Sequence, residues 1–145
     1  MDRTEFNNVV TALIADVRTR TGLPASLEID DTYDGDLPML TLEYRGLTAI
    51  TLFPNKSFKN AEFAFALILK SRMANGGQLS NVLYAETQIA KTIPESVNGT
   101  SDEPNFSLTI SGYEVKYSIA WNTQTRTNED EYTREFELKL TINKE

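Results

Sequence analysis

The densest group of side chains that could do chemistry is the acidic segment 30–36, which carries Asp30, Asp31, Asp34 and Asp36. Hard cations such as calcium prefer oxygen ligands, so this segment is a candidate metal loop. Aligned on Asp30, however, the EF-hand pattern places Thr41 where a bidentate Glu is required. Asp34-Gly35 is also a strong turn dipeptide. We therefore interpret segment 30–36 as a solvated hairpin loop and leave cation binding open.

Paired carboxylates form a second candidate group, because glycosidase-like chemistry needs two acids set a few ångströms apart in a cleft. Several glutamates lie on expected strands, namely Glu28, Glu43, Glu114, Glu135 and Glu137. No pair among them is distinguished by its spacing. The pattern is typical of the solvent-facing side of a sheet.

Other catalytic chemistry is restricted by composition, because the chain has no His and no Cys. The sequence thus excludes an imidazole acid or base, a His-dependent triad, thiolate nucleophiles and disulfides. Gly76-Gly77 lacks the spacing of both the phosphate-loop and the dinucleotide-binding motifs. We expect that the protein binds no cofactor and is not an enzyme. An enzyme built on this chain would work with carboxylates, Lys, Tyr, Ser or backbone groups.

Aromatic side chains offer a binding surface instead of a catalytic one. Tyr113, Tyr117 and Trp121 recur along one expected strand, and Tyr132 begins the next. Aromatic residues at period two are typical of core and cross-strand pairs, and Tyr and Trp are also enriched at interfaces. With one residue of an expected apolar helix, they form our candidate interface: Phe63, Tyr113, Tyr117, Trp121 and Tyr132.

The elements that position these residues begin with a helix. Apolar side chains from Phe6 to Val17 recur at helical spacing, with Asp2 or Thr4 as the cap and Gly22 as the terminator. Residues 27–53 change to period two, with turn signals at Asp34-Gly35 and Arg45-Gly46. We expect a three-stranded antiparallel meander over this range.

Two further helices are expected next. Residues 58–73 are apolar on nearly all sides, which predicts a buried helix capped by Ser57. Ser80 caps a helix that Pro94 ends. Residues 95–104 are rich in turn formers and predict a loop.

Strands are expected again at 106–110, 113–121 and 132–142, with a polar loop at 122–131. Residues 1–145 therefore predict a single α+β domain in α-βββ-αα-βββ order, with an antiparallel sheet and helices packed on one face.

The formal net charge is −7, which favours solubility and argues against direct nucleic-acid binding. No signal peptide is recognisable, and the longest apolar run, 63–69, is far shorter than the roughly 20 residues of a spanning helix. We expect a soluble protein that does not contact a membrane, in the cytoplasm or associated with a virion.

The opening helix, Gly22-Leu23-Pro24 and the expected strands after it resemble the fold of secretion chaperones, small acidic proteins that bind an effector chain. The likeness extends to about residue 94, where a long hairpin replaces the expected ending. The element order also resembles that of small phage tail-completion and terminator proteins. Neither resemblance rests on a specific motif, so neither identifies a family.

Our leading hypothesis is a non-enzymatic protein-interaction or assembly protein, such as a small structural component of a phage or mobile element. Its partner is another protein or a second copy of the chain. One alternative is an acidic inhibitor, an immunity protein or a mimic of nucleic acid. Another is a small-molecule binder or a carboxylate-based enzyme.

Overall fold

The computed structural model describes residues 1–27, 38–72, 79–93, 96–97, 100–101, 107–110, 112–127 and 131–144. Its helices and strands, in chain order, are α1 (Arg3–Thr21), β1 (Ala25–Ser26), β2 (Met39–Leu52), β3 (Phe58–Arg72), α2 (Leu79–Thr92), β4 (Ser96–Val97), β5 (Thr100–Ser101), β6 (Ser107–Ile110), β7 (Tyr113–Thr127) and β8 (Glu131–Lys144). The acidic segment 30–36 and Gly76-Gly77 lie outside the described residues.

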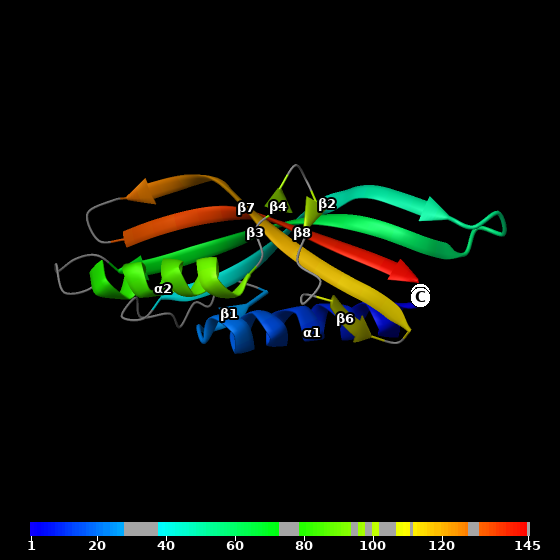
Figure 1. The fold of residues 1–145 in the computed structure, drawn as a ribbon, viewed down its shortest axis with the longest axis horizontal. Coiled ribbons are helices and arrows are strands. Elements are labelled where there is room, and N and C mark those ends of the chain that lie inside the picture. Colours follow the sequence, from blue (N-terminus) through cyan, green and yellow to red (C-terminus); the bar gives the residue numbers. More distant parts are fainter. Residues whose placement is uncertain are drawn as a thin grey trace.

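The architecture is a curled six-stranded sheet with two helices on one side (Figure 1). The strand order is β1-β2-β3-β8-β7-β6, and β4 and β5 form a separate two-stranded hairpin. Neighbouring strands of the large sheet are antiparallel except β1 and β2, which are parallel. The predicted α+β class, with helices on one face of an antiparallel sheet, is confirmed.

Helix α1 begins and ends where the sequence predicts. The Asp2 side chain accepts a hydrogen bond of 2.8 Å from the backbone N–H of Glu5, which satisfies one of the free donors of the first turn. Gly22 ends the helix in the left-handed conformation, and its N–H donates to the carbonyl of Arg18 at 2.9 Å. The apolar stripe of α1 faces the core.

The helix expected over 58–73 is wrong, because residues Phe58–Arg72 form strand β3. Odd-numbered β3 residues such as Phe65 and Leu67 are buried against the helices, whereas Ala64 and Ala66 lie on the opposite face. Strand β3 is hydrogen-bonded on both edges, to β2 and to β8. Apolar residues on both faces suit a central strand, and the alanines weakened the period-two signal.

The expected meander is also wrong in detail. Residues 39–52 form one continuous strand, β2, so Arg45-Gly46 is not a turn. The described strand before it, β1, comprises Ala25 and Ser26 and runs parallel to β2, whereas residues 28–37 lie outside the described part of the chain. The actual turn joins β2 to β3, where the N–H of Phe53 donates to the carbonyl of Ser57 at 2.8 Å.

The C-terminal half follows the prediction more closely. Helix α2 and strands β6, β7 and β8 correspond to predicted elements. The loop expected at 122–131 is wrong for most of its length, because β7 continues to Thr127 and β8 begins at Glu131. Within the loop expected at 95–104, residues 96–97 and 100–101 form the β4–β5 hairpin.

One hydrophobic core lies between the sheet and the two helices. Val9, Leu13 and Val17 enter it from α1, and Ala85 and Ile89 from α2. The sheet side of this core is formed by the long antiparallel strand pairs β2·β3, β3·β8 and β7·β8.

Candidate protein-interaction surface

One part of the sheet carries apolar side chains that the helices do not cover. Four residues in the outer half of β2 are about half-exposed: Tyr44 at 55%, Leu47 at 48%, Ile50 at 51% and Leu52 at 45%. We call these four residues the β2 strip. Earlier on the same strand, Leu40 and Leu42 are buried. The change from buried to exposed therefore occurs within one strand.

The β2 strip faces the same way as the core. Tyr44 pairs with Phe65 of β3, Leu47 with Phe63, and Ile50 with Ala61. Residues directly opposite each other in an antiparallel ladder point to the same face of the sheet. Phe65 and Ala61 are buried, and the Tyr44 ring lies 5.3 Å from the Phe65 ring. The strip is thus an open extension of the hydrophobic core.

Two bulges in β2 place the strip on this face. The register shifts between Tyr44 and Gly46 and again between Leu47 and Ala49, so β2 has one extra residue at each point. Without the shifts, strict alternation would turn Leu47 to the opposite face. Gly46 has a φ of 135°, which glycine adopts without the penalty that a Cβ brings.

The opposite face of the same strand segment is polar and paired. The Arg45 guanidinium lies 3.4 Å from the Glu135 carboxylate and 3.8 Å from the Glu43 carboxylate. The Thr48 hydroxyl donates to the Glu62 carboxylate at 2.9 Å. The outer half of β2 is therefore amphipathic, with its charges and apolar side chains on different faces.

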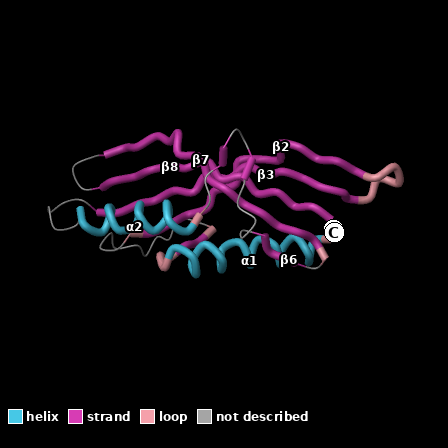
Figure 2. The backbone as a smooth tube through the Cα atoms, in the orientation of Figure 1, coloured by secondary structure: helices cyan, strands magenta, loops and turns pink. Residues whose placement is uncertain are grey.

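The strip stays exposed because α1 covers the neighbouring strand. The Phe6 ring of α1 contacts Phe58 and Phe63 of β3, with ring centroids 6.1 and 6.2 Å apart. A helix is about 10 Å wide and strands are about 4.8 Å apart, so one helix covers about two strands. The β2–β3 hairpin also extends beyond the end of α1 along the long axis of the molecule (Figure 2).

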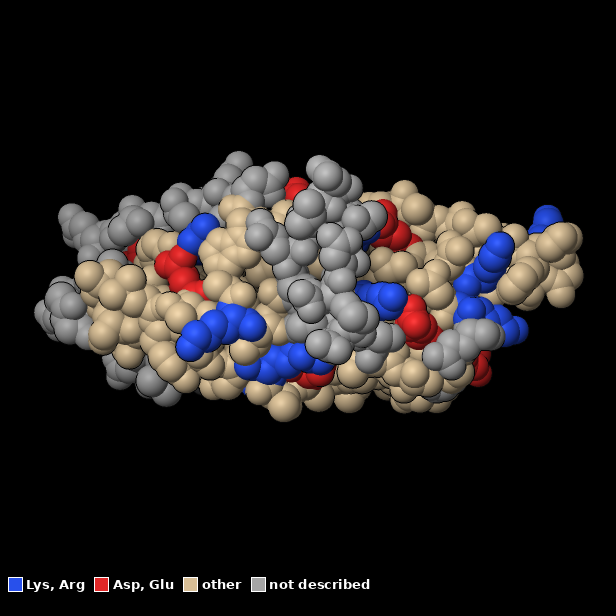
Figure 3. All heavy atoms as spheres, in the orientation of Figure 1, with Lys and Arg blue, Asp and Glu red and all other residues tan. Residues whose placement is uncertain are grey.

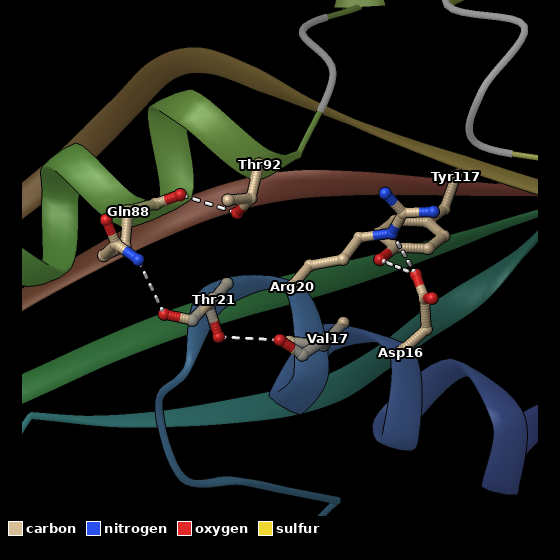
Figure 4. Close-up of polar contacts among 7 residues, drawn as sticks. All are labelled: Asp16, Val17, Arg20, Thr21, Gln88, Thr92 and Tyr117. Atoms are coloured by element: carbon tan, nitrogen blue, oxygen red, sulfur yellow. Dashed lines mark hydrogen bonds and ion pairs between the residues drawn. The ribbon is translucent and has the colours of Figure 1, made fainter.

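Covered parts of the sheet, in contrast, are tied to the helices by partly buried polar contacts. Figure 4 shows the Tyr117 hydroxyl and the Arg20 guanidinium converging on the Asp16 carboxylate, which joins β7 to α1. Burial, followed by the Asp16 carboxylate, raises the pKa of Tyr117 well above its ordinary value. The tyrosine hydroxyl therefore stays protonated and donates a hydrogen bond to Asp16, so the group has a structural role rather than that of a base.

Helix α2 has an equivalent tie to β8. The Arg134 guanidinium pairs with the Glu86 carboxylate and lies 5.0 Å from the ring centroids of both Trp121 and Phe136. Desolvation, followed by the hydrogen bond to Glu86, raises the pKa of Tyr132. A further bond joins the two helices, because the Gln88 amide donates to the carbonyl of Thr21 at 3.4 Å (Figure 4).

A second group of exposed apolar side chains lies on α2. Leu79, Leu83 and Tyr84 are 45%, 59% and 56% exposed, whereas Val82, Ala85 and Ile89 of the same helix are buried. These exposed residues lie on the solvent side of a helix whose core side is fully packed. They differ from the β2 strip, which is a core-facing surface left open.

Of the residues predicted from sequence as a candidate interface, Phe63 borders the β2 strip and the other four lie elsewhere. Tyr113 and Tyr117 are buried, and Phe63, Trp121 and Tyr132 are partly buried and pack against the core. Their use in an interface stays a prediction. The β2 strip was missed because Arg45-Gly46 was interpreted as a turn. The apolar content of residues 47–53 was the sequence signal that could have indicated this surface.

Several of the described acidic side chains lie beside cations. Glu62 pairs with Lys139 at 2.6 Å and Glu114 with Lys116 at 3.2 Å. On the face in Figure 3, Lys and Arg lie beside Asp and Glu rather than apart from them. Among the described residues, no group of three or more acidic side chains is arranged to hold a metal ion.

None of the described helices combines the length and the apolar character that membrane crossing requires. No protein-family model matches the chain, and no curated protein matches it. Among solved structures, one chain with 14% sequence identity superimposes with a TM-score of 0.59, covering 99% of this chain and 96% of the other. At this identity the likeness shows the fold alone.

Proposed function

We propose that this protein is a non-enzymatic interaction protein that contributes the β2 strip to a protein assembly. The observation that carries the proposal is the strip itself, a core-facing surface that remains about half-exposed. A small structural component of a phage or mobile element is one protein of this class.

Covering the strip stabilises a complex through the hydrophobic effect. Fully burying a Leu or Ile side chain contributes about 1.5–3 kcal/mol, so each half-exposed strip residue contributes about 1 kcal/mol. Single exposed apolar residues are ordinary on protein surfaces. Four of them adjoining the core form a contiguous surface, and such surfaces mark interaction sites.

The contacts of the carboxylates favour this function over the acidic alternatives. A mimic of nucleic acid needs carboxylates gathered on one face, but Glu62, Glu114 and Glu135 each lie beside a cation. A carboxylate enzyme needs two acids converging in a cleft. The partly buried carboxylates of Asp16 and Glu86 instead tie helices to the sheet.

Co-expression of tagged and untagged copies in the cell of origin tests the proposal. The strip variant Leu47→Glu with Ile50→Glu adds two charges to the strip. The matched control, Leu83→Glu with Tyr84→Glu, adds two charges to the exposed side of α2. We expect the wild type and the α2 control to capture the same protein, either the untagged copy or another chain, and the strip variant to lose it.

Circular dichroism and thermal unfolding of all three proteins show that the variants are folded. The proposal is contradicted if a folded strip variant captures the same proteins as the wild type. Loss of capture in the α2 control alone would place the interaction on the helix.

A further inference from the structure

Among the described strands, none covers the outer edge of β2 along the β2 strip. Strand β1 pairs with β2 only at Leu40 and Thr41, and no other described strand pairs with this edge. Strand β2 ends at Leu52. Within the described part of the chain, the edge of β2 that pairs with no strand therefore runs from residue 42 to residue 52, with Leu47 at its midpoint, and we call it the free edge. Unpaired N–H and C=O groups on such an edge can pair with another strand.

The core-facing residues of this edge are arranged symmetrically about Leu47. They are Leu42, Tyr44, Leu47, Ile50 and Leu52. Successive members are separated by two, three, three and two positions, so the spacing is the same in both directions. The separations of three arise at the two bulges. An ordinary strand would show a separation of two throughout.

We propose that the occupant of the β2 strip is a second copy of this chain, with the two β2 strands paired antiparallel about Leu47. This inference rests on the proposed function and specifies its partner. Antiparallel pairing of two identical strands reverses the direction of one of them, so only a symmetric pattern aligns with itself. Leu47 then lies opposite Leu47 of the other protomer, Tyr44 opposite Ile50, and Leu42 opposite Leu52.

The two residues between Tyr44 and Leu47 in one protomer lie opposite the two residues between Leu47 and Ile50 in the other. The bulged parts of the two strands are therefore equal in length. The register is therefore specific, because a slip by one residue would place core-facing side chains opposite polar ones. Glu43 lies opposite Thr51, and Arg45 opposite Ala49, so no like charges oppose each other. The free edge also contains no Pro and no Lys, residues that natural edge strands use to prevent pairing.

Paired in this way, the two sheets form one continuous sheet whose helices lie on the same side. Only one strand edge and four half-exposed side chains per protomer meet, which is smaller than a standard interface of about 800 Å² per partner. We therefore expect a reversible dimer with a dissociation constant in the micromolar range.

Disulfide trapping tests the pairing directly, because the chain has no cysteine and each introduced thiol is unique. Leu47→Cys places two thiols opposite each other at the two-fold axis. Opposed residues in antiparallel strands have Cα atoms about 4.5–5.5 Å apart, within the range of a disulfide. Ile50→Cys places its two thiols roughly 20 Å apart, because they are separated by six residues at about 3.3 Å each. Leu83→Cys is the control on α2.

Under mild oxidation at a concentration near the dissociation constant, we expect Leu47→Cys to form at least tenfold more disulfide dimer than Ile50→Cys or Leu83→Cys. The double variant Tyr44→Cys with Ile50→Cys should cross-link as strongly as Leu47→Cys. Equal cross-linking of all single variants, or no cross-linking of Leu47→Cys, overturns the second copy as occupant. If capture by the strip is then still lost in Leu47→Glu with Ile50→Glu, the proposed function stands with a different partner.

Discussion

Strand β2 contains two regions with opposite environments. Leu42 is 1% exposed beneath the helices, whereas Leu47, five residues later, is 48% exposed on the same face of the same sheet. The first region belongs to a core whose helices are tied to the sheet through Asp16 and Glu86. The second region has the same apolar face, and no described helix lies over it. This difference is the basis of our proposal that a partner covers the strip.

The largest expected effect compares these two leucines. Leu42→Ala should lower the free energy of unfolding by about 2–5 kcal/mol, because it removes buried methyl groups and leaves a cavity. Leu47→Ala should lower it by less than about 1 kcal/mol in the monomer, because half of its side chain already contacts water. Urea denaturation at low protein concentration measures both. Similar losses for the two variants would contradict the distinction between the regions.

The tie between α1 and β7 should give the next largest effect. Tyr117→Phe removes a buried hydroxyl that donates to Asp16, which should lower the free energy of unfolding by about 1–3 kcal/mol at neutral pH. Because Phe keeps the aromatic ring, the loss of unfolding free energy measures the contribution of the hydrogen bond alone. An unchanged stability would show that this contact does not hold α1.

The same variant has a pH signature. The pKa of Tyr117 is raised in the folded state above its ordinary value of 10.0, so the folded protein keeps a proton that the unfolded chain releases. The unfolded chain then binds fewer protons, and stability falls as the pH rises above about 10. The contribution is fully present below that pH. Denaturation from pH 8 to pH 11 should therefore show a steeper loss of unfolding free energy for the wild type than for Tyr117→Phe. If the unfolding free energies of the two proteins fall in parallel with pH, the hydrogen bond from Tyr117 to Asp16 is contradicted.

Substitution at the bulges that place the strip on the core face should have a smaller effect on stability. Gly46→Ala should lower the free energy of unfolding by about 1–2 kcal/mol, because alanine is strained at a φ of 135°. A control, Ala49→Gly, changes a neighbouring exposed position without adding a Cβ. If Gly46→Ala is no less stable than wild type, the first bulge does not need glycine.

The smallest effect belongs to the polar face of the strip region. Arg45→Ala removes an exposed ion pair with Glu135 and should lower the free energy of unfolding by about 0.2–1 kcal/mol, decreasing as salt is added. Arg134→Ala, which breaks the half-buried pair with Glu86 and two ring contacts, should lower it more. An equal loss in both variants would show that burial does not distinguish these pairs.

Sequence patterns predicted the elements whose signal is local. The stripe from Phe6 to Val17 and the caps at Asp2 and Gly22 define α1 because each acts within one or two turns. The alternation in β7 and β8 was equally direct. These elements supply most of the covered core.

The strip and β3 could not be predicted because their conformation depends on distant strands. Residues 58–72 contain several alanines, which favour helix locally, and only the pairing with both β2 and β8 makes them a central strand. Arg45-Gly46 has the composition of a turn, and only its register against β3 shows a bulge. The exposed strip follows from that bulge, so it could not be identified before the pairing was known.

The most direct test of the account is the solution mass by light scattering over a concentration series from a few micromolar to about a millimolar, spanning the weak dissociation constant expected for a small interface. We expect the wild type and Leu83→Glu with Tyr84→Glu to rise from 16.3 kDa toward twice that mass. The folded variant Leu47→Glu with Ile50→Glu should remain at 16.3 kDa throughout. A wild type that stays monomeric at every concentration, or a strip variant that dimerises like the wild type, would contradict self-association through β2.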